Sequence, residues 1–390
     1  MPRGAKINTG TRPAAARTVV GMAAPRRAAA LRWSAVGALV AVLAGLPSVL
    51  GALPVSDRPV SATDLRAAVL ASAGVSFSGY AESAGGLSLP VTDRLTSVAD
   101  LFSDRTTMRV WWRGPADNRV DVVSAGRETG IHRGPGATWT WEYETATATR
   151  AAASPLDLPA PPDLLPTSLG RRVLSEATDD ELSRLGARRV AGRDTLGVRL
   201  TPAAPASSVR RVDVWVDPPT GLALQVEVVE KDGNRTALDS RFLDLDLAVP
   251  APEVTAFVPP PGASVRAGGV ADIVREARQR LRPVTFPAEL AGLPRRELAG
   301  APAGIGLYGR GVTLLVVAPL PPGLAGGLRN ALAGSPDAVR DEAGTRLAAG
   351  PVGLMLVEPP GRGPYVLTGS VTLDALVTAA GQLPELADAP

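Results

Sequence analysis

The side chains best suited to chemistry gather in one short stretch, residues 137–150, which reads ATWTWEYETATATR. Trp139, Trp141 and Tyr143 occupy alternate positions there, and Glu142 and Glu144 fall between and after them. Because successive side chains of a strand point to opposite faces, the three rings share one face and the two glutamates share the other. The stretch therefore offers both a carboxylate pair and an aromatic surface.

The carboxylate pair suggests one kind of enzyme. A glycoside hydrolase needs two carboxyl groups that flank the scissile bond. Glu142 and Glu144 are two positions apart on a strand, which separates them by roughly 7 Å at the backbone. A glycan-acting enzyme is therefore a distant alternative, and solvated glutamates are the simpler interpretation.

Other catalytic chemistries lack the residues that they need. The chain has no Cys and a single His, His132, which lies in the turn-like sequence IHRGPG, so thiol, zinc and triad chemistry have too few groups. Neither Lys6 nor Lys231 follows a glycine, which excludes a Walker A loop. We expect no enzymatic activity, no catalytic residue, no metal site and no cofactor, and we expect His132 at the surface or in a hairpin.

The aromatic side chains remain as candidates for binding. We expect the lining of an apolar ligand site to consist of Trp111, Trp139, Trp141, Tyr143 and Trp215. Ordinary packing in a core or on a strand face is the alternative. Trp111 is followed directly by Trp112, so these two rings point to opposite faces. A sheet face with such rings needs a cover, either the Pro- and Leu-rich segment 154–169 or a ligand.

The distribution of charge argues against nucleic-acid binding. The chain has a formal net charge of +3, but residues 1–56 contain seven basic and no acidic side chains, which leaves 34 basic against 38 acidic ones in the rest. The body of the protein therefore lacks the excess of positive charge that a phosphate backbone requires.

A run without charged residues, from Trp33 to Ser56, follows the basic segment 1–32. It is long enough for a membrane-spanning helix, which needs roughly 20 apolar residues. Positive charge before such a helix predicts a cytoplasmic tail at 1–32 and an extracytoplasmic body. We expect a single-pass anchor at residues 33–53, with contact to the membrane there; a cleaved signal peptide, and hence a secreted protein, is the alternative.

Sheet dominates the next part of the chain, residues 57–262. Ser61, followed three positions later by Asp64, predicts the start of a short helix. Alternating segments separated by Gly, Pro and Asn then predict an antiparallel meander up to about residue 150. After a short helical turn at 179–186, further strands are expected, with DPPTG and KDGN as turns between them.

A second, smaller α+β domain is expected at residues 270–390. Proline-rich residues 249–262 mark the exit from the first domain, because Pro continues neither a helix nor a strand ladder. Residues 270–282 predict an amphipathic basic helix, and Thr372 predicts the start of the last helix.

The order of these segments resembles the exported RseB/MucB proteins of the LolA-like superfamily. The resemblance covers roughly residues 60–260 in order and spacing, and it runs through FSGYAE, VWWRGPADNRVDVV, TWTWEYETATATR, VAGRDTLGVRLTP, VDVWVDPPTGLALQVEVVEKDG and FLDLDL. The resemblance implies an antiparallel half-barrel covered by helices. The tail segments GIGLYGRGVTLLVV and YVLTGSVTLDALVTAA are similar to the smaller C-terminal domain of RseB, which LolA lacks.

The resemblance also implies a function. RseB-like members bind an apolar ligand, a lipid or a lipoprotein acyl chain, and the extracytoplasmic part of an anti-sigma factor in envelope-stress signalling. We therefore expect an extracytoplasmic, membrane-anchored regulator or sensor, with Trp139, Trp141 and Tyr143 on the concave side of the half-barrel. A lipid or lipoprotein carrier of LolA type is the alternative. The expected anchor and the compact WEYETATATR depart from the pattern of the family.

Overall fold

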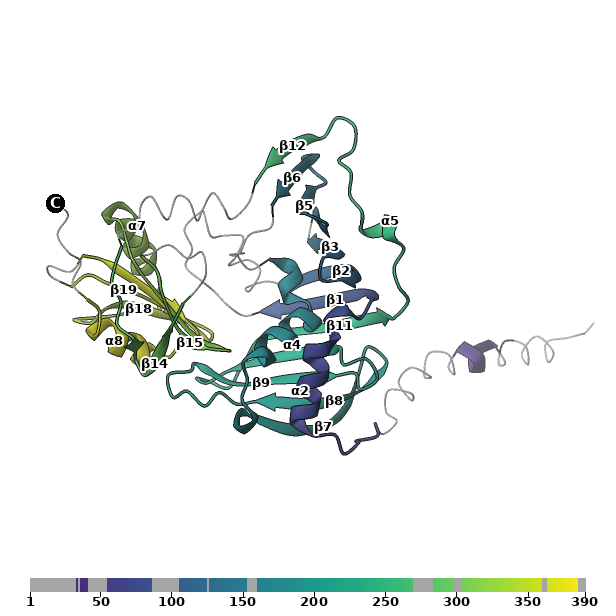
Figure 1. The fold of residues 1–390 in the computed structure, drawn as a ribbon, viewed down its shortest axis with the longest axis horizontal. Helices are drawn as coiled ribbons and strands as arrows, with labels where there is room; N and C mark the ends of the chain where they lie inside the picture. The colour runs from purple at the N-terminus through teal and green to yellow at the C-terminus, as the bar shows by residue number, and fades with distance from the viewer. Residues whose placement is uncertain are drawn as a thin grey trace, which may run out of the picture. The chain divides into compact units, whose positions relative to one another are not determined.

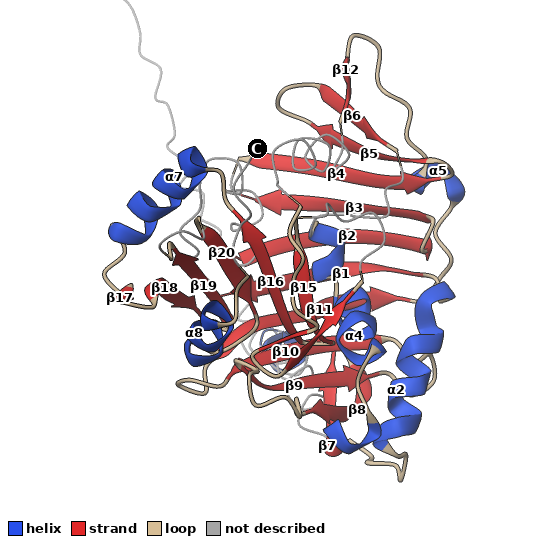
Figure 2. Cartoon of the chain, turned by 60° about the vertical axis from the view of Figure 1, so that its left-hand side comes forward, coloured by secondary structure: helices blue, strands red, loops and turns tan. Residues whose placement is uncertain are grey.

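The computed structural model describes residues 33, 36–40, 55–85, 105–124, 126–152, 160–268, 283–297, 304–359 and 363–384. The chain divides into two compact units, Met1–Pro54 and Val55–Pro390, and the second unit contains two β-sheets (Figures 1 and 2). The predicted basic tail at 1–32 and the predicted basic helix at 270–282 lie outside the described residues.

The predicted single-pass anchor at residues 33–53 is wrong. In the part of the chain that the structure describes, no helix is both long and apolar enough to cross a membrane. A spanning helix needs roughly 20 consecutive apolar residues, whereas the described helical residues of this stretch are Trp33 and residues 36–40. The remainder of the stretch up to Pro54 lies outside the described residues.

The larger sheet has twelve strands within the described residues, in the order β12-β6-β5-β4-β3-β2-β1-β11-β10-β9-β8-β7. They are β1 (Phe77–Gly85), β2 (Arg105–Gly114), β3 (Asp117–Ser124), β4 (Arg127–Gly134), β5 (Ala137–Glu142), β6 (Thr147–Ala151), β7 (Leu182–Val190), β8 (Arg193–Leu200), β9 (Val209–Val216), β10 (Ala223–Glu230), β11 (Thr236–Asp246) and β12 (Ser264–Ala267). Neighbouring strands are antiparallel, except that β12 runs parallel to β6. The predicted antiparallel meander is confirmed for β2 to β5.

Pairing between β1 and β11 joins two meanders into this one sheet. Strands β1 to β6 follow one another on one side of the junction, and β11 back to β7 follow on the other. Ser78 lies opposite Asp246 and Gly85 opposite Leu238, with a bulge after Tyr80. The two strands are far apart in sequence, so their pairing depends on the tertiary structure.

Two helices, α2 (Ala62–Ala71) and α4 (Pro166–Ser175), cover one face of the larger sheet (Figures 1 and 2). As predicted, Ser61 caps α2, because its Oγ accepts a hydrogen bond from the backbone N–H of Asp64 at 3.0 Å. The core beneath the helices contains Leu65, Val69, Val173, Leu174, Val198, Val212, Val214 and Val226, all buried. Burial of each such aliphatic side chain stabilises the fold by about 1.5–3 kcal/mol.

A second cluster of buried side chains lies on the same face. Leu164, at the end of the 3₁₀ turn η2 (Pro161–Leu164), and Leu165 pack with Phe77, Trp112 and Phe242. The ring of Phe77 stacks on that of Trp112 at 5.9 Å between centroids. The described end of the Pro- and Leu-rich segment therefore covers the same face as the helices.

Two local features differ from the sequence-based expectation. The predicted helical turn at 179–186 is limited to η3 (Asp179–Glu181), since β7 begins at Leu182 and pairs with β8. The strand through the three rings ends at Glu142, before Tyr143, and the chain turns back into β6 with Ala146 at a φ of 46°. A turn without Gly, Asn or Pro carries no signal in the sequence.

The smaller sheet has eight strands within the described residues, in the order β13-β14-β15-β16-β20-β19-β18-β17. They are β13 (Glu289–Leu290), β14 (Leu293–Arg296), β15 (Gly306–Arg310), β16 (Thr313–Pro319), β17 (Val339–Asp341), β18 (Gly344–Ala349), β19 (Val352–Val357) and β20 (Tyr365–Gly369), with α7 (Pro322–Ala333) and α8 (Leu373–Gly381) beside them. As predicted, Thr372 caps α8, and its Oγ1 accepts from the backbone N–H of Ala375 at 3.2 Å. The described chain is thus mostly β, with a large antiparallel sheet and a few short helices; the half-barrel and the domain limits at 57–262 and 270–390 stay predictions.

A loop of the larger sheet, residues 201–208, contributes to the core of the smaller one. Ala206 is buried in the same cluster as the side chains of β16 and α8. Ser207 forms a bridge with Val371, and the backbone N–H of Thr372 donates to the carbonyl of Ala206 at 2.9 Å. The two sheets therefore share apolar packing as well as backbone hydrogen bonds.

Ion pairs add to this contact. The Glu176 carboxylate accepts two N–H groups of Arg296, each at 2.8 Å, and the backbone N–H of Gly311 at 2.7 Å. Arg310 donates to the Glu181 carboxylate at 2.8 Å. Burial alone would raise the pKa of Glu181, but hydrogen bonds from Arg310, from backbone N–H groups and from a hydroxyl lower it to about 2.

The close approach of α4 to the sheet gives a test of this packing. A Cβ added at Gly170 would lie 2.6 Å from the Cβ of Ala223, so α4 would have to move outward. We expect Gly170→Ala to lower the free energy of unfolding by about 1–3 kcal/mol. Gly327→Ala in α7, where nothing lies within 4 Å of the added Cβ, is the control and should stabilise by about 0.5–1 kcal/mol. Urea unfolding of both variants measures the difference, and equal stabilisation would contradict the packing described.

Candidate functional site

The strand register places four of the five predicted lining rings, Trp111, Trp139, Trp141 and Trp215, on one face of the larger sheet, opposite α2 and α4. Tyr143 follows the end of β5 and joins them through its contacts with Trp141 and Arg119. Trp139 lies opposite His132, His132 opposite Arg119, and Arg119 opposite Trp111 in successive strands. Trp215 alternates with the buried valines of β9, which puts it on this same side. We call this side of the sheet the ring face.

A continuous band of rings and guanidinium groups crosses the ring face. This ring band consists of Trp111, Arg119, Tyr143, Trp141, Phe257, Trp139 and Arg150. The Arg119 guanidinium lies 4.9 Å from the centroid of Trp111, and it donates to the Tyr143 hydroxyl at 3.2 Å. Tyr143 meets Trp141 edge-on at 5.9 Å. Phe257 then connects Trp141 and Trp139, with centroid distances of 6.0 and 5.6 Å, and Arg150 lies 5.9 Å from the Trp139 ring.

The segment that returns from β11, residues 250–257, covers part of the ring band. It contains the short helix α5 (Pro252–Thr255) and then Phe257. The Thr255 hydroxyl donates to Asp117 at 2.6 Å, and Arg113 donates to the carbonyl of Pro250. The cover of these rings is therefore this segment, whereas the described part of the segment expected to cover them, 154–169, packs on the opposite face.

His132 lies beneath this cover rather than in an exposed turn, because β4 continues to Gly134 and the turn is formed by Pro135 and Gly136. It belongs to β4 and is 5% exposed. Its Nδ1 is 3.1 Å from the carbonyl oxygen of Thr255, and its ring is 4.7 Å from that of Phe257. Burial is the largest effect and lowers the pKa of His132, and the charge of Arg119 lowers it further. The imidazole is consequently neutral near pH 7.

A pocket of about 410 Å³ lies between β4, β5, β6 and the covering segment. Its lining includes three rings, two polar side chains and one guanidinium group, namely Trp139, Phe257, His132, Asp117, Thr255 and Arg150. We call it the ring pocket. Its size is within the range of roughly 300–1,000 Å³ that is usual for small-ligand sites.

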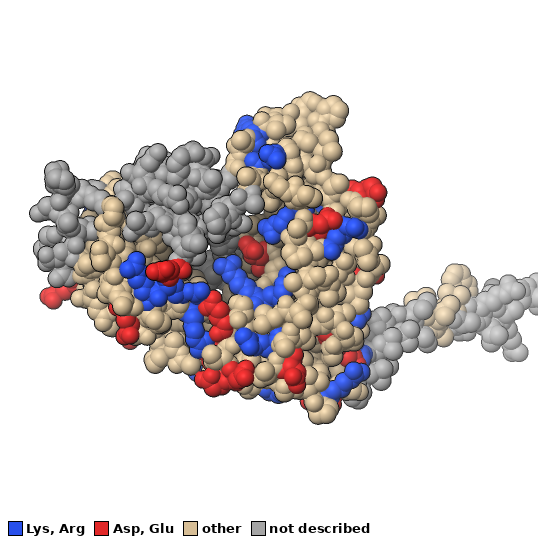
Figure 3. Space-filling view, in the orientation of Figure 1, with Lys and Arg blue, Asp and Glu red and all other residues tan. Residues whose placement is uncertain are grey.

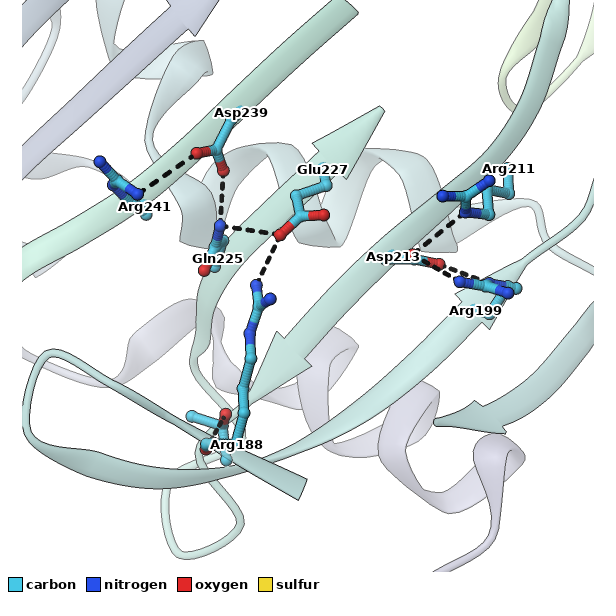
Figure 4. A network of polar contacts seen from close by, with 9 residues as sticks. Arg188, Arg199, Arg211, Asp213, Gln225, Glu227, Asp239 and Arg241 are labelled. Carbon is cyan, nitrogen blue, oxygen red and sulfur yellow. Dashed lines mark hydrogen bonds and ion pairs between the residues drawn. The ribbon is translucent and has the colours of Figure 1, made fainter. Parts of the chain in front are cut away.

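Trp215 is not part of the ring band. The Arg188 guanidinium lies 3.9 Å above its ring and donates to Glu227 at 2.7 Å. A chain of polar contacts runs on through Gln225 to Asp239, with donor–acceptor distances of 2.9 and 2.6 Å (Figure 4). Burial raises the pKa of Asp239. A pocket of about 660 Å³ lies over this network, and its charged groups are largely bonded to one another.

The two glutamates of the opening stretch do not face a common cleft. Glu142 accepts from the Thr145 hydroxyl at 2.9 Å, and Glu144 accepts from the backbone N–H of Glu128 at 2.6 Å. Both are exposed at the turn between β5 and β6. Trp112 points to the helix-covered face and is 3% exposed, as expected from its place next to Trp111.

The sequence analysis missed three members of the ring band. Phe257 follows the proline-rich exit segment, and nothing local shows that this segment returns across the sheet. Arg119 and Arg150 are two among 41 basic residues, and only the register places them over aromatic rings. The alternation of Arg119 with Val120 was the one available signal, since it indicates which face each side chain takes.

Charges of both signs are interspersed on the face seen in Figure 3, with no single basic surface. Many arginines in the described residues pair with carboxylates, as Arg199 does with Asp213 at 2.7 Å. This pattern agrees with the charge count, which argues against a phosphate backbone as partner.

Comparison with known proteins finds a structural likeness at low sequence identity. No family model and no curated protein sequence matches the chain. Among solved structures, MucB in complex with the periplasmic part of MucA is 16% identical, with a TM-score of 0.47 over 84% of this chain and 100% of that one. The Pseudomonas aeruginosa MucA/MucB complex is 15% identical, with a TM-score of 0.48 over 84% and 99%. A LolA superfamily protein from Nitrosomonas europaea is 11% identical, with a TM-score of 0.23 over 51% and 98%. MucB and LolA-superfamily proteins are thus among the structural neighbours of this chain, as the sequence resemblance predicted.

His132 gives a prediction for stability against pH. Its folded pKa is lowered below the usual 6.5, so the unfolded chain binds the proton more tightly. The stabilisation is complete above about pH 6.5 and is lost as the pH falls through the folded pKa. We expect the melting temperature to fall between pH 7.5 and 5.5 and to fall less in His132→Asn. Since His132 is the single histidine of the chain, equal pH dependence in both proteins would contradict its burial as a neutral ring.

Proposed function

We propose that this protein is a binding protein without enzymatic activity, which acts outside the cytoplasm as a regulator or sensor. It holds an apolar ligand, an acyl chain or an apolar peptide, against the ring band, with Trp139 in the ring pocket and Trp111 and Tyr143 as further lining. Trp141, the fourth predicted residue of the band, is only 8% exposed. Trp215, the fifth predicted residue, lies beneath Arg188 in a separate polar network. The proposed binding site therefore does not include it.

The observation that carries this proposal is the ring pocket. Trp139 and Phe257 present rings 5.6 Å apart at a pocket of about 410 Å³. Tyr143 is 43% exposed, next to Trp141. Large aromatic surface left accessible beside a pocket is typical of binding sites, because ordinary core packing would bury it.

The kind of partner follows from the family resemblance. MucB, to which the order of segments is similar, is found in complex with the periplasmic part of MucA. By that resemblance we propose the extracytoplasmic part of an anti-sigma factor as the protein partner. Export is supported by the charge-free run from Trp33 to Ser56 behind a basic segment.

The contact between the two sheets favours a regulator over a carrier of LolA type. A carrier would need the larger sheet alone, whereas here Ala206 is buried in the core of the smaller sheet and Arg310 pairs with Glu181. In this proposal, both sheets therefore take part in the function.

Calorimetric titration tests the proposal. The full exported chain is titrated with the extracytoplasmic segment of the anti-sigma factor encoded in the same genome. We expect saturable binding that Trp139→Ala weakens at least tenfold, about 1.4 kcal/mol, while the melting temperature changes by only a few degrees.

Leu324→Ala is the matched control for this titration. It removes another accessible apolar side chain, 49% exposed, on α7 and away from the ring band. Its affinity should equal that of the unaltered chain. No binding by the unaltered chain would refute the proposed partner, and equal affinity for Trp139→Ala would refute the ring band as the site.

A further inference from the structure

Among the charged side chains around the ring pocket, one positive group has no ion-pair partner in the described part of the chain. The negative charge of Asp117 is balanced by Arg113, which donates to it at 2.8 Å, and the Thr255 hydroxyl also donates to it at 2.6 Å. His132 is buried and neutral. Among the described residues, no carboxylate lies within ion-pair distance of the exposed Arg150, which rests on the Trp139 ring at 5.9 Å. Arg150 is therefore a positive group in the lining of the pocket for which the described residues provide no ion-pair partner.

The lining of the pocket combines apolar side chains with polar ones. Trp139 and Phe257 offer ring faces, and Pro135 and Pro252 add apolar surface. Asp117 and Thr255 bring polar atoms that are already hydrogen-bonded to one another. A single ring can pack on the apolar side chains and leave these polar groups accessible to water.

We infer that the ring pocket binds an acidic segment of a protein partner: one aromatic side chain of the segment packs in the pocket against Trp139 and Phe257, and a neighbouring carboxylate pairs with Arg150. The inference rests on the proposed function, since it names the chemistry of the partner at the same site. An Arg that already lies over a ring keeps its fork of N–H donors free for a carboxylate.

A peptide fits this pocket better than an acyl chain does. A long acyl chain that fills the pocket would remove the polar groups of Asp117 and Thr255 from water without offering them hydrogen bonds, which costs free energy. The larger pocket beside Trp215 is a weaker candidate, because Glu227 and Asp239 there are already bonded to Arg188 and Gln225.

His132 provides a reporter for binding, because it is the single histidine in the sequence and lines the pocket. The full chain, with no histidine tag, is labelled with isotopes at histidine, and the imidazole NMR signal is followed during titration. The probes are three blocked peptides, acetyl-Glu-Phe-Glu-amide, acetyl-Gln-Phe-Gln-amide and acetyl-Lys-Phe-Lys-amide. Sodium myristate is the fourth probe.

We expect the glutamate peptide to shift the His132 signal saturably, and the glutamine peptide to bind about fivefold more weakly. The lysine peptide should bind most weakly of the three. Arg150→Gln should remove the advantage of the glutamate peptide, and so should high salt, because the pair lies at an exposed rim.

Arg133→Gln is the matched control, since Arg133 is on β4 and lies opposite Asn118 and Thr138 in the register, on the other face of the sheet. It makes the same change of charge and should leave the preference intact. Equal binding of all three peptides, or a preference that survives Arg150→Gln, would overturn the inference. A shift with myristate and none with any peptide would overturn it in favour of an acyl ligand.

The two proposals fail separately. If the anti-sigma segment binds the chain but does not move the His132 signal, the function stands and the ring pocket is refuted as its site. If the glutamate peptide binds as expected and the anti-sigma segment does not, the pocket chemistry stands and the partner is a different acidic protein.

Discussion

The pairing of β1 with β11 is the constraint on which the rest of the structure depends. Without it, the two meanders would be separate sheets with edges exposed at β1 and at β11. With it, side chains from both meanders share one core, in which Phe77 and Phe242 pack edge to face at 5.5 Å. The approach is so close that a Cβ at Gly79 would lie 2.5 Å from the carbonyl oxygen of Asp244. Glycine is required at this position because the backbones touch.

That pairing also decides what each face of the sheet becomes. Since side chains alternate, a single register sets Val110 and Trp112 under the helices and Trp111 on the ring face. The helix-covered face is apolar, and its side chains are buried beneath α2, α4 and residues 164–165. The ring face collects aromatic rings at one end and a polar network around Trp215 at the other, so it is the face with accessible chemistry.

The chain leaves the sheet at the end of β11 and must travel to the far edge, where β12 adds beside β6. This path carries residues 250–257 across the ring face and places Phe257 between Trp139 and Trp141. The ring pocket is a consequence of that crossing: the sheet supplies one wall and the returning segment supplies the other. Its polar anchors, Thr255 on Asp117 and the Thr255 carbonyl on His132, hold the segment in place.

The sequence by itself determined the local features of this protein. Alternation predicted the strands β2 to β5, the caps at Ser61 and Thr372 were found where expected, and the spacing of Trp139 and Trp141 placed them on one face. The order of its segments also predicted that RseB/MucB and LolA-like proteins would be among the structural neighbours. These signals are local because they depend on periods of two or 3.6 residues and on hydrogen bonds within one turn. The tertiary structure alone decided which face the rings occupy, which segment covers them and that His132 is buried, since each of these depends on strand register and on contacts between residues far apart in the chain. An apolar run of residues likewise predicts the capacity to span a membrane, whereas the described structure contains no helix that could do so.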